Sequence, residues 1–244
     1  MKLETLPNKY PALCILKTTK KMSDEQHLDK VYRRRFNAYE CEQKNKIWEV
    51  LCPDFFQQFI PEEARVLDIG AGYCEFINNI RCREKLAVDL NEDTPAYANS
   101  DVSVTNSPST DLGFLSDNSI DRVFMSNFLE HLRTKQEVLK TFEEIYRILK
   151  PGGKVITLHP NIHYLYMHYW DYFDHHVPLT DKSIAEGLEV VGFKVELSIA
   201  KFLPFTTKSK IPKHPILVKL YLKFPLVWKI MGKQAFVVAG KPSS

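Results

Sequence analysis

The stretch Val66-Leu67-Asp68-Ile69-Gly70-Ala71-Gly72-Tyr73-Cys74-Glu75-Phe76 decides the fold of this chain. Its first four residues are rich in branched aliphatic side chains, which predicts a buried parallel strand. Two glycines spaced one residue apart then permit a tight turn and close approach of the backbone to a ligand. Residues 75–80 are expected to begin a helix whose first N–H groups face that ligand. Strand, glycine turn and helix in this order are typical of a nucleotide-type cofactor site.

The composition favours one domain in a reducing compartment. The 244 residues are 44% hydrophobic and 12% aromatic, which is enough for a large core. The chain has no run of about 18 apolar residues that would span a membrane, and its N-terminal residues do not resemble a signal peptide. The five cysteines form no C-x-x-C pair, so we expect neither a disulfide framework nor a zinc site. We therefore expect a cytoplasmic protein.

Charge is distributed unevenly along the chain. The net charge is +3, yet nine of the 33 basic residues and none of the 30 acidic ones follow Glu196. Apolar and aromatic residues are interspersed with these lysines, which leaves two interpretations of residues 205–231 open. The favoured one is a lid helix that buries apolar residues against the sheet. The other is a peripheral contact with an anionic membrane.

The rest of the chain alternates strand and helix patterns. We predict seven strands, at residues 65–69, 85–88, 102–105, 120–125, 154–158, 193–198 and 235–239. Helices are predicted at residues 43–59, 134–149, 180–191, 216–222 and 226–231. This alternation predicts an α/β fold: a seven-stranded, mostly parallel sheet with helices on both faces and the ligand at the carboxyl ends of the strands.

We divide this single domain into three parts. Residues 1–60 are expected to form an N-terminal arm and helical extension packed on the core, with a potential capping box at Ser23 and Gln26. Residues 61–200 are expected to form the cofactor-binding core. Residues 201–244 are expected to form a basic, apolar insertion between the sixth and seventh strands, followed by the last strand.

Two cofactors compete for the glycine turn. A dinucleotide site requires a third glycine in G-x-G-x-x-G, where this chain has Glu75. S-adenosylmethionine carries a cationic sulfonium and no phosphate, and its site requires an acid at the end of the first strand, where Asp68 lies. Both sites use a carboxylate at the end of the second strand to bind the ribose hydroxyls, and Asp89 provides it. The missing glycine favours S-adenosylmethionine.

Four segments together resemble a known family: VLDIGAGYCEF, LAVDLN, SIDRVFMSNFLEHL and RILKPGGKVITLHPN. In this order and spacing they are similar to the class I S-adenosylmethionine-dependent methyltransferases, over residues 31–200. The segments YRRRF, YWDYFDHHVPLTDKSIAEGLEVVGF and KFLPFTTKS resemble a bacterial group of small-molecule methyltransferases. Members of that group are often associated with the synthesis of cell-surface polysaccharide or glycolipid. The resemblance implies a Rossmann-like sheet whose seventh strand is antiparallel.

The resemblance also implies roles for individual residues. Asp68 and the turn Gly70-Ala71-Gly72 would hold the methionyl end of the cofactor, and Asp89 would hold the ribose. The remaining cofactor contacts implied by the resemblance are Leu90 on the adenine, Ser109 and Thr110 at the adenine edge, and Asn127 at the methyl-transfer centre. Cys74 departs from the family, because many members have a glycine there. We interpret it as a buried, inert thiol.

Methyl transfer to a hydroxyl requires a group that removes a proton, and histidine does this near neutral pH. Five histidines fall on the expected acceptor side, between the fifth strand and the next helix: His159, His163, His168, His175 and His176. We name His131, His175 and His176 as candidate bases, with structural roles left open. Tyr169, Trp170, Asp171 and Asp174 are candidates for an acceptor wall or a packed lid. We favour a metal-free site over a histidine-rich metal site, because no histidine pair has a convincing H-x-x-x-H spacing on a helix.

We therefore expect transfer of a methyl group from S-adenosylmethionine to a small acceptor, with S-adenosylhomocysteine as the product. By resemblance alone, the acceptor is a hydroxyl on a sugar or glycolipid precursor. A non-catalytic scaffold subunit with the same fold is the second hypothesis, and an NAD(P)-dependent reductase is the third. Nucleic acid is disfavoured as a partner, because Ser126-Asn127-Phe128 is not an Asn-Pro-Pro-Tyr type of motif and the basic charge is confined to the tail. The sequence does not fix the oligomeric state.

Overall fold

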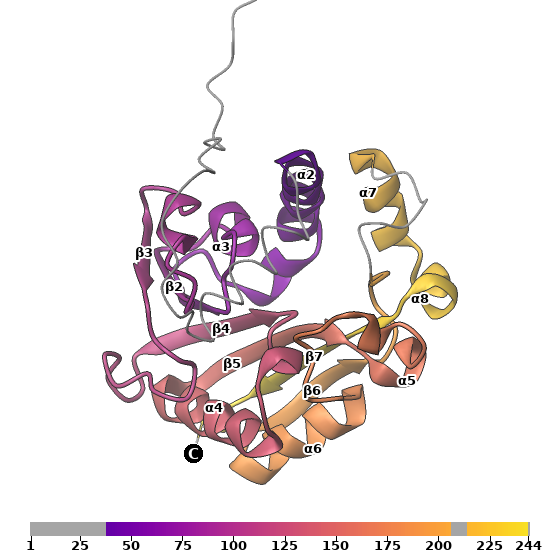
Figure 1. The fold of residues 1–244 in the computed structure, drawn as a ribbon. Coiled ribbons are helices and arrows are strands. Elements are labelled where there is room, and N and C mark those ends of the chain that lie inside the picture. The colour runs from indigo at the N-terminus through magenta and orange to yellow at the C-terminus, as the bar shows by residue number, and fades with distance from the viewer. Residues whose placement is uncertain (1–37, 206–213, 244) are drawn as a thin grey trace, which may run out of the picture.

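The computed structural model describes residues 38–205 and 214–243. They form three layers, with one sheet between two layers of helices (Figure 1). The expected capping box at Ser23 and Gln26, the YRRRF segment and part of the basic insertion lie outside the described residues. Within them, no helix has both the length and the apolar content that crossing a membrane requires.

The sheet has the predicted seven strands in the order β3-β2-β1-β4-β5-β7-β6. Their bounds are β1 Arg65–Ile69, β2 Glu84–Val88, β3 Val102–Thr105, β4 Ile120–Ser126, β5 Leu149–Pro160, β6 Lys194–Ile199 and β7 Gln234–Gly240. Strand β7 runs antiparallel to both of its neighbours, β5 and β6, and the other pairs are parallel. The predicted fold class is therefore confirmed. The carboxyl ends of β1, β2 and β4 meet at one edge of the sheet, where a doubly wound fold binds its ligand.

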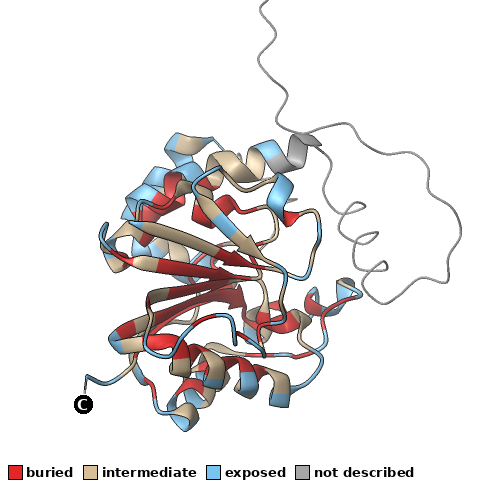
Figure 2. Cartoon of the chain, turned by 90° about the vertical axis from the view of Figure 1, so that its left-hand side faces the viewer, coloured by how far each residue is buried: buried red, intermediate tan, exposed pale blue. Residues whose placement is uncertain are grey.

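Helices cover both faces of the sheet (Figure 1). One face carries α2 (Ala38–Asp54), α3 (Glu75–Asn79) and the helices of the insertion, α7 (Pro215–Lys223) and α8 (Pro225–Met231). The other face carries α4 (Lys135–Ile148) and α6 (Asp181–Val191), while α5 (Ile162–Leu165) is a single turn after β5. Buried residues are concentrated in the sheet and on the helix faces turned toward it (Figure 2).

Local sequence explains where several helices begin and end. Thr134 accepts a hydrogen bond from the Glu137 N–H at the start of α4, and Thr180 forms a capping box with Ser183 at the start of α6. Gly192 ends α6 with a φ of 112°, a conformation that favours glycine.

The helix predicted at residues 43–59 ends earlier than expected. Helix α2 stops at Asp54, and residues 56–59 form a separate 3₁₀ turn. The break lets Phe55 and Phe56 point into the aromatic core, where Phe55 stacks on Phe202 with ring centroids 4.3 Å apart. Tertiary packing therefore overrides the helical pattern at this point.

Candidate active site

The glycine turn after β1 uses left-handed backbone at three positions. Gly70, Gly72 and Cys74 have φ values of 70°, 52° and 59°. A Cβ at position 70 would lie 2.3 Å from Cδ2 of Phe128, so glycine is required there for space as well as for conformation. At position 72 an added Cβ would meet nothing within 4 Å. The Cys74 side chain is buried, and burial raises the pKa of its thiol, as an unreactive thiol requires.

Three carboxylates surround this turn. Asp68 is 3% exposed, and its pKa is raised first by burial and then by the negative charges of Glu75 and Asp89. Glu75 is also buried and forms an ion pair with Lys44 at 3.0 Å. Among the residues that the structure describes, the three acids therefore carry more negative charge than Lys44 offsets, and a cationic ligand would relieve the repulsion.

Asp89 connects the ends of β1 and β2. Its Oδ2 accepts a hydrogen bond from the Gly72 N–H at 2.7 Å, and its Oδ1 accepts one from the Asn91 N–H at 2.8 Å. These bonds fix the carboxylate beside the glycine turn before any ligand binds. Leu90, the next residue, exposes 46% of its surface, as a side chain that packs on an adenine ring would.

The loop expected at the adenine edge is attached to α4. The Ser109 side chain is buried, and its hydroxyl lies 2.7 Å from the hydroxyl of Thr141. The Ser109 side chain therefore holds the loop to the helix and leaves only its backbone for a ligand. Thr110 is partly exposed on the same loop.

Asn127, just beyond β4, is held in a strained conformation. Its φ is 48°, an uncommon value for a residue other than glycine that tends to occur at functional sites. The Gln234 side chain, buried at the start of β7, donates a hydrogen bond from Nε2 to Oδ1 of Asn127 at 2.5 Å. The Asn127 N–H donates to the Leu158 carbonyl at 2.8 Å. Gln234 was missed from the sequence because only the strand order brings it beside Asn127.

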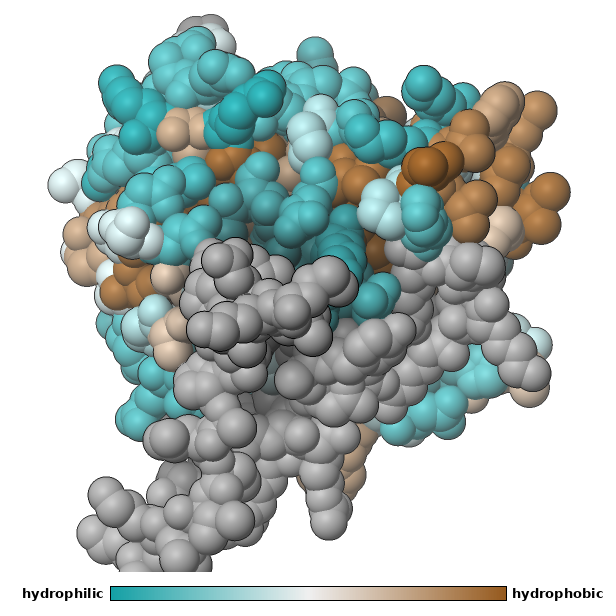
Figure 3. All heavy atoms as spheres, turned by 90° about the horizontal axis from the view of Figure 1, so that it is seen from above, coloured by the Kyte–Doolittle hydropathy of each residue, from teal (hydrophilic) through white to brown (hydrophobic). Residues whose placement is uncertain are grey.

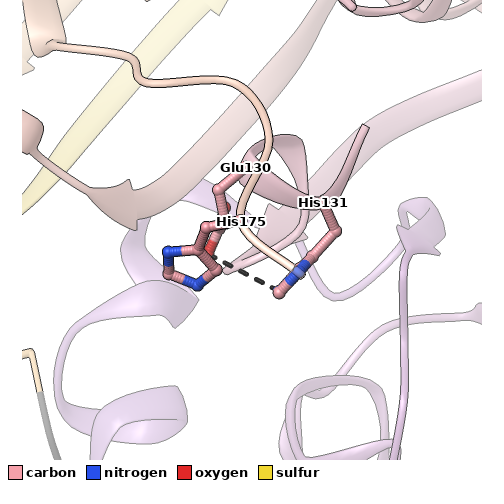
Figure 4. A group of neighbouring side chains, drawn as sticks. All are labelled: Glu130, His131 and His175. Carbon is pink, nitrogen blue, oxygen red and sulfur yellow. Dashed lines mark ion pairs between the residues drawn. The ribbon is translucent and has the colours of Figure 1, made fainter. Parts of the chain in front are cut away.

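His131, four residues after Asn127, belongs to a cluster of acidic residues and histidines (Figure 4). Nδ1 of His131 lies 3.0 Å from the carbonyl oxygen of Asp174 and 3.2 Å from its Oδ2. The other ring nitrogen, Nε2, lies 4.0 Å from Oε1 of Glu130. The ring centroids of His131 and His175 are 5.1 Å apart. Asp174 thus fixes the orientation of His131 through Nδ1 and directs Nε2 toward Glu130.

The cluster is electrostatically coupled. Burial raises the pKa of Glu130 to about 7, although the neighbouring His131 acts to lower it. Burial alone would lower the pKa of His131, but the hydrogen bond with Asp174 and the charges of Glu130 and Asp174 raise it above its usual value. Burial raises the pKa of Asp89, and the charge of His131 is among the effects that oppose this rise. The histidine is therefore within electrostatic reach of the carboxylate expected to bind the ribose.

Three members of this cluster could hold a metal ion. Glu130, His131 and His175 each offer a ligand atom, and these atoms all lie within 4.8 Å of one another. The sequence could not show this group, because His175 lies 44 residues after His131 and in a loop.

The other candidates on the acceptor side are placed differently. His176 is exposed, whereas the adjacent His175 is buried and stacks on Tyr172 with ring centroids 4.8 Å apart. Tyr169 is buried, and its hydroxyl donates to the Val177 carbonyl, so it packs within the loop.

Two of the four candidates for the acceptor wall face solvent. Trp170 and Asp171 are exposed, and Asp171 lies 3.2 Å from Nδ1 of His168. The other two contact the cluster: Asp174 lies against His131, and Tyr169 lies against His175 with ring centroids 4.6 Å apart.

His159 lies in the core beneath the site. It is 2% exposed on β5, and burial lowers its pKa to about 3, opposed by an interaction with the Thr180 backbone. The folded protein therefore binds fewer protons at this ring than the unfolded chain does between about pH 3 and pH 6.5. Protonation favours unfolding, so this contribution to stability is present above pH 6.5 and is lost as the pH falls.

We expect this histidine to make folding acid-sensitive. Between pH 7 and pH 5 the free energy of unfolding should fall by about 2 kcal/mol more in the wild type than in His159→Leu. Urea unfolding at the two pH values measures the difference. His163→Leu, which alters an exposed histidine, should keep the wild-type pH dependence. Equal pH dependence in wild type and His159→Leu would contradict the assignment.

The strand order, the antiparallel β7 and the glycine turn after β1 together define the class I methyltransferase fold. Residues 67–157 match the model of a family described as methyltransferase domain. The matched segment and the fold are therefore similar to those of S-adenosylmethionine-dependent methyltransferases.

Part of this chain is similar in sequence to a curated protein. The chain is 34% identical over 107 residues to "Putative methyltransferase YqeM" of Bacillus subtilis (strain 168), a match that covers 38% of this chain and 41% of that protein. This chain thus spans less than half the length of that curated relative.

Two solved structures share the fold. One is an S-adenosylmethionine-dependent methyltransferase from Archaeoglobus fulgidus, with a TM-score of 0.62, 20% identity, and coverage of 83% of this chain and 98% of the other. The second is a chain of a complex that contains the Haloferax volcanii Trm112 methyltransferase activator, with a TM-score of 0.62, 18% identity, and coverage of 86% and 97%.

Proposed function

We propose that this protein transfers a methyl group from S-adenosylmethionine to a hydroxyl of a small acceptor. The observation that carries the proposal is the group of three carboxylates, Asp68, Glu75 and Asp89, around the glycine turn. The pyrophosphate of a dinucleotide would meet like charge there, whereas a sulfonium and an ammonium group would meet opposite charge. The chemistry of the site therefore favours S-adenosylmethionine over NAD(P).

The described residues fit this cofactor. Asp68 and the turn from Gly70 to Gly72 would hold its methionyl end, and Asp89 would accept hydrogen bonds from the ribose hydroxyls. The exposed side chain of Leu90 would pack on the adenine. When bound, S-adenosylmethionine supplies an activated methyl group and leaves as S-adenosylhomocysteine.

His131 is the strongest of the three candidate bases. Asp174 holds Nδ1, which leaves Nε2 as the nitrogen that accepts the proton of the acceptor hydroxyl. Nε2 would take the proton of the acceptor hydroxyl, and the negative charge of Asp174 would stabilise the resulting imidazolium. This arrangement supports catalytic turnover over a scaffold role, because a scaffold has no use for an oriented base.

The acceptor class follows from the resemblance and from the loop above the site. We propose a hydroxyl on a sugar or glycolipid precursor, because the segment from Tyr169 to Phe193 resembles methyltransferases of cell-surface glycan synthesis. Tyr172, stacked on His175, provides an aromatic surface beside the cluster that could pack on a sugar ring. We further propose that the reaction takes place on the cytoplasmic side of the membrane.

Asp89→Ala tests the cofactor site. We expect the affinity for S-adenosylhomocysteine, measured by calorimetry, to fall about 100-fold, because two charge-assisted hydrogen bonds are lost. Glu92→Gln, which removes an exposed acid from the same loop, should bind like the wild type. Wild-type affinity in Asp89→Ala would contradict the assignment. Release of labelled methyl into sugar and glycolipid acceptors then tests turnover, and binding without transfer to any acceptor would favour the scaffold.

A further inference from the structure

The outward face of α7 and α8 is apolar. Six large hydrophobic side chains there are between 43% and 80% exposed: Ile216, Leu217, Leu220, Phe224, Leu226 and Ile230. Figure 3 shows hydrophobic side chains gathered at this edge of the molecule. Such a concentration of large exposed hydrophobic side chains marks an interaction surface.

The opposite face of the same helices is fixed to the protein. Leu222 is buried, and Val218, Tyr221 and Trp228 pack against the core beside α2. Trp228 donates from Nε1 to the Tyr221 carbonyl at 2.7 Å, and the Tyr221 hydroxyl donates to the Phe202 carbonyl. The two helices therefore do cover the core as a lid would, while they present a second apolar face outward.

Positive charge accompanies this outward face. Lys219, Lys223 and Lys229 lie among the exposed apolar residues, and no acidic residue follows Glu196 in the sequence. Lys219 forms an ion pair with Asp54 at 3.3 Å. A partner that complements apolar side chains surrounded by lysines is an anionic lipid surface.

A second group of exposed hydrophobic residues lies beside this face. Tyr166, Met167, Trp170 and Phe173 are between 57% and 89% exposed in the loop after β5. The residue that precedes α5 is joined to the end of the insertion, because the Asn161 N–H donates to the Lys233 carbonyl at 3.0 Å, just beyond α8. On the other side, Phe205 contacts Tyr172 with ring centroids 5.4 Å apart. Tryptophan and tyrosine favour the membrane–water interface.

Both groups border the proposed reaction centre. The insertion leads from α8 through Lys233 to Gln234, whose side chain holds Asn127. The aromatic loop continues to His175 and to Asp174, which holds His131. In both segments, side chains that touch the centre therefore lie within four residues of the apolar surface in the sequence.

We propose that α7, α8 and residues 166–173 dock on the surface of an anionic bilayer, and that the acceptor hydroxyl belongs to a lipid-linked molecule in that bilayer. The docking stands on the surface described above, whereas the acceptor rests on the proposed function. Docking brings the centre to the membrane surface, so a lipid-linked acceptor reaches His131 without leaving the bilayer.

Sedimentation with lipid vesicles tests the docking. We expect the full chain to sediment with phosphatidylserine-containing vesicles and to stay in solution with pure phosphatidylcholine. L226S/I230S, two changes at exposed sites, should weaken the binding about tenfold or more, and K223E/K229E should also weaken it. Val190→Ser, at an exposed apolar residue of α6 on the other side of the sheet, should bind like the wild type.

Three results would overturn the docking. They are an absence of vesicle binding, equal binding by L226S/I230S and the wild type, and a dimer in solution that L226S/I230S converts to monomers. The last would assign the face to a second copy of the chain.

Calorimetry with S-adenosylhomocysteine on the same variants separates the docking from the proposed function. All variants should keep wild-type cofactor affinity, because the changes lie outside the cofactor site. If the wild type did not bind S-adenosylhomocysteine, the proposed function would be contradicted, but the vesicle result would still hold. If docking holds, transfer to a soluble acceptor as efficient as transfer to its lipid-linked form in vesicles would contradict the lipid-linked acceptor.

Discussion

His131→Ala is expected to lower kcat by about 100- to 10,000-fold, the usual contribution of a general base. The affinity for S-adenosylhomocysteine should stay close to that of the wild type, because His131 lies on the acceptor side. Single-turnover transfer of labelled methyl and calorimetry measure the two effects separately. A variant with near-wild-type kcat would remove His131 from the mechanism.

Two variants sharpen this result. His176→Ala changes an exposed histidine in the same loop and should leave kcat unchanged. Asp174→Asn keeps the size of the side chain but removes the charge that raises the pKa of His131. The pKa of His131 should then fall, so the rise of kcat with pH should move to lower pH, and kcat at its maximum should fall because the imidazolium is less stabilised. A pH profile that does not move would contradict the coupling of Asp174 to the base.

Metal chelation separates the two chemistries open to this cluster. If His131 acts as a base, a chelator should leave kcat unchanged, and Zn²⁺ should inhibit by binding Nε2 together with Glu130 and His175. If a chelator abolished activity and one divalent metal restored it, the cluster would be a metal site instead, and His131 would be a ligand.

The cofactor half of the site could be predicted from the sequence for a geometric reason. Asp68 and Asp89 lie at or just beyond the ends of two adjacent strands, and parallel strands bring such residues to the same edge of the sheet. The glycines of the turn are visible in the sequence because few other residues adopt left-handed backbone. Strand patterns and topology rules therefore suffice, without knowledge of any loop.

The acceptor half depends on contacts that no local pattern encodes. Asp174 reaches His131 across 43 residues, and Gln234 reaches Asn127 across 107. His175 and His176 were both candidate bases, and the backbone of an irregular loop decides which of the two is turned inward. The arrangement of that loop therefore had to come from the structure.

The insertion shows the same limit on a larger scale. The sequence predicted its two helices, and the structure has them at Pro215–Lys223 and Pro225–Met231. Apolar residues occur around the whole circumference of α7, so the hydrophobic pattern does not show which face packs inward. The sequence left a lid and a membrane contact as alternatives. In the structure, one face of the helix pair packs on the core and the other face is exposed and apolar.

Gly70→Ala is expected to destabilise the fold by about 2–5 kcal/mol. Left-handed backbone at alanine costs about 1–2 kcal/mol, and the new methyl group would lie 2.3 Å from Phe128, which adds about 1–3 kcal/mol of overpacking. For a chain of this size, thermal unfolding should show a loss of about 4–20 °C in Tm. Displacement of Phe128 should also disturb Asn127 and His131 on either side of it, so kcat should fall as well.

Gly72→Ala is the matched control, because it has a similar left-handed φ but nothing within 4 Å of the added Cβ. It should therefore cost only the backbone strain of about 1–2 kcal/mol, while the methyl group beside Asp89 lowers the affinity for S-adenosylhomocysteine. If the contact with Phe128 causes the larger loss of stability in Gly70→Ala, the added substitution Phe128→Ala should destabilise the Gly70→Ala variant less than it destabilises the wild-type protein. Equal losses of Tm in Gly70→Ala and Gly72→Ala would show instead that backbone conformation alone selects glycine in this turn.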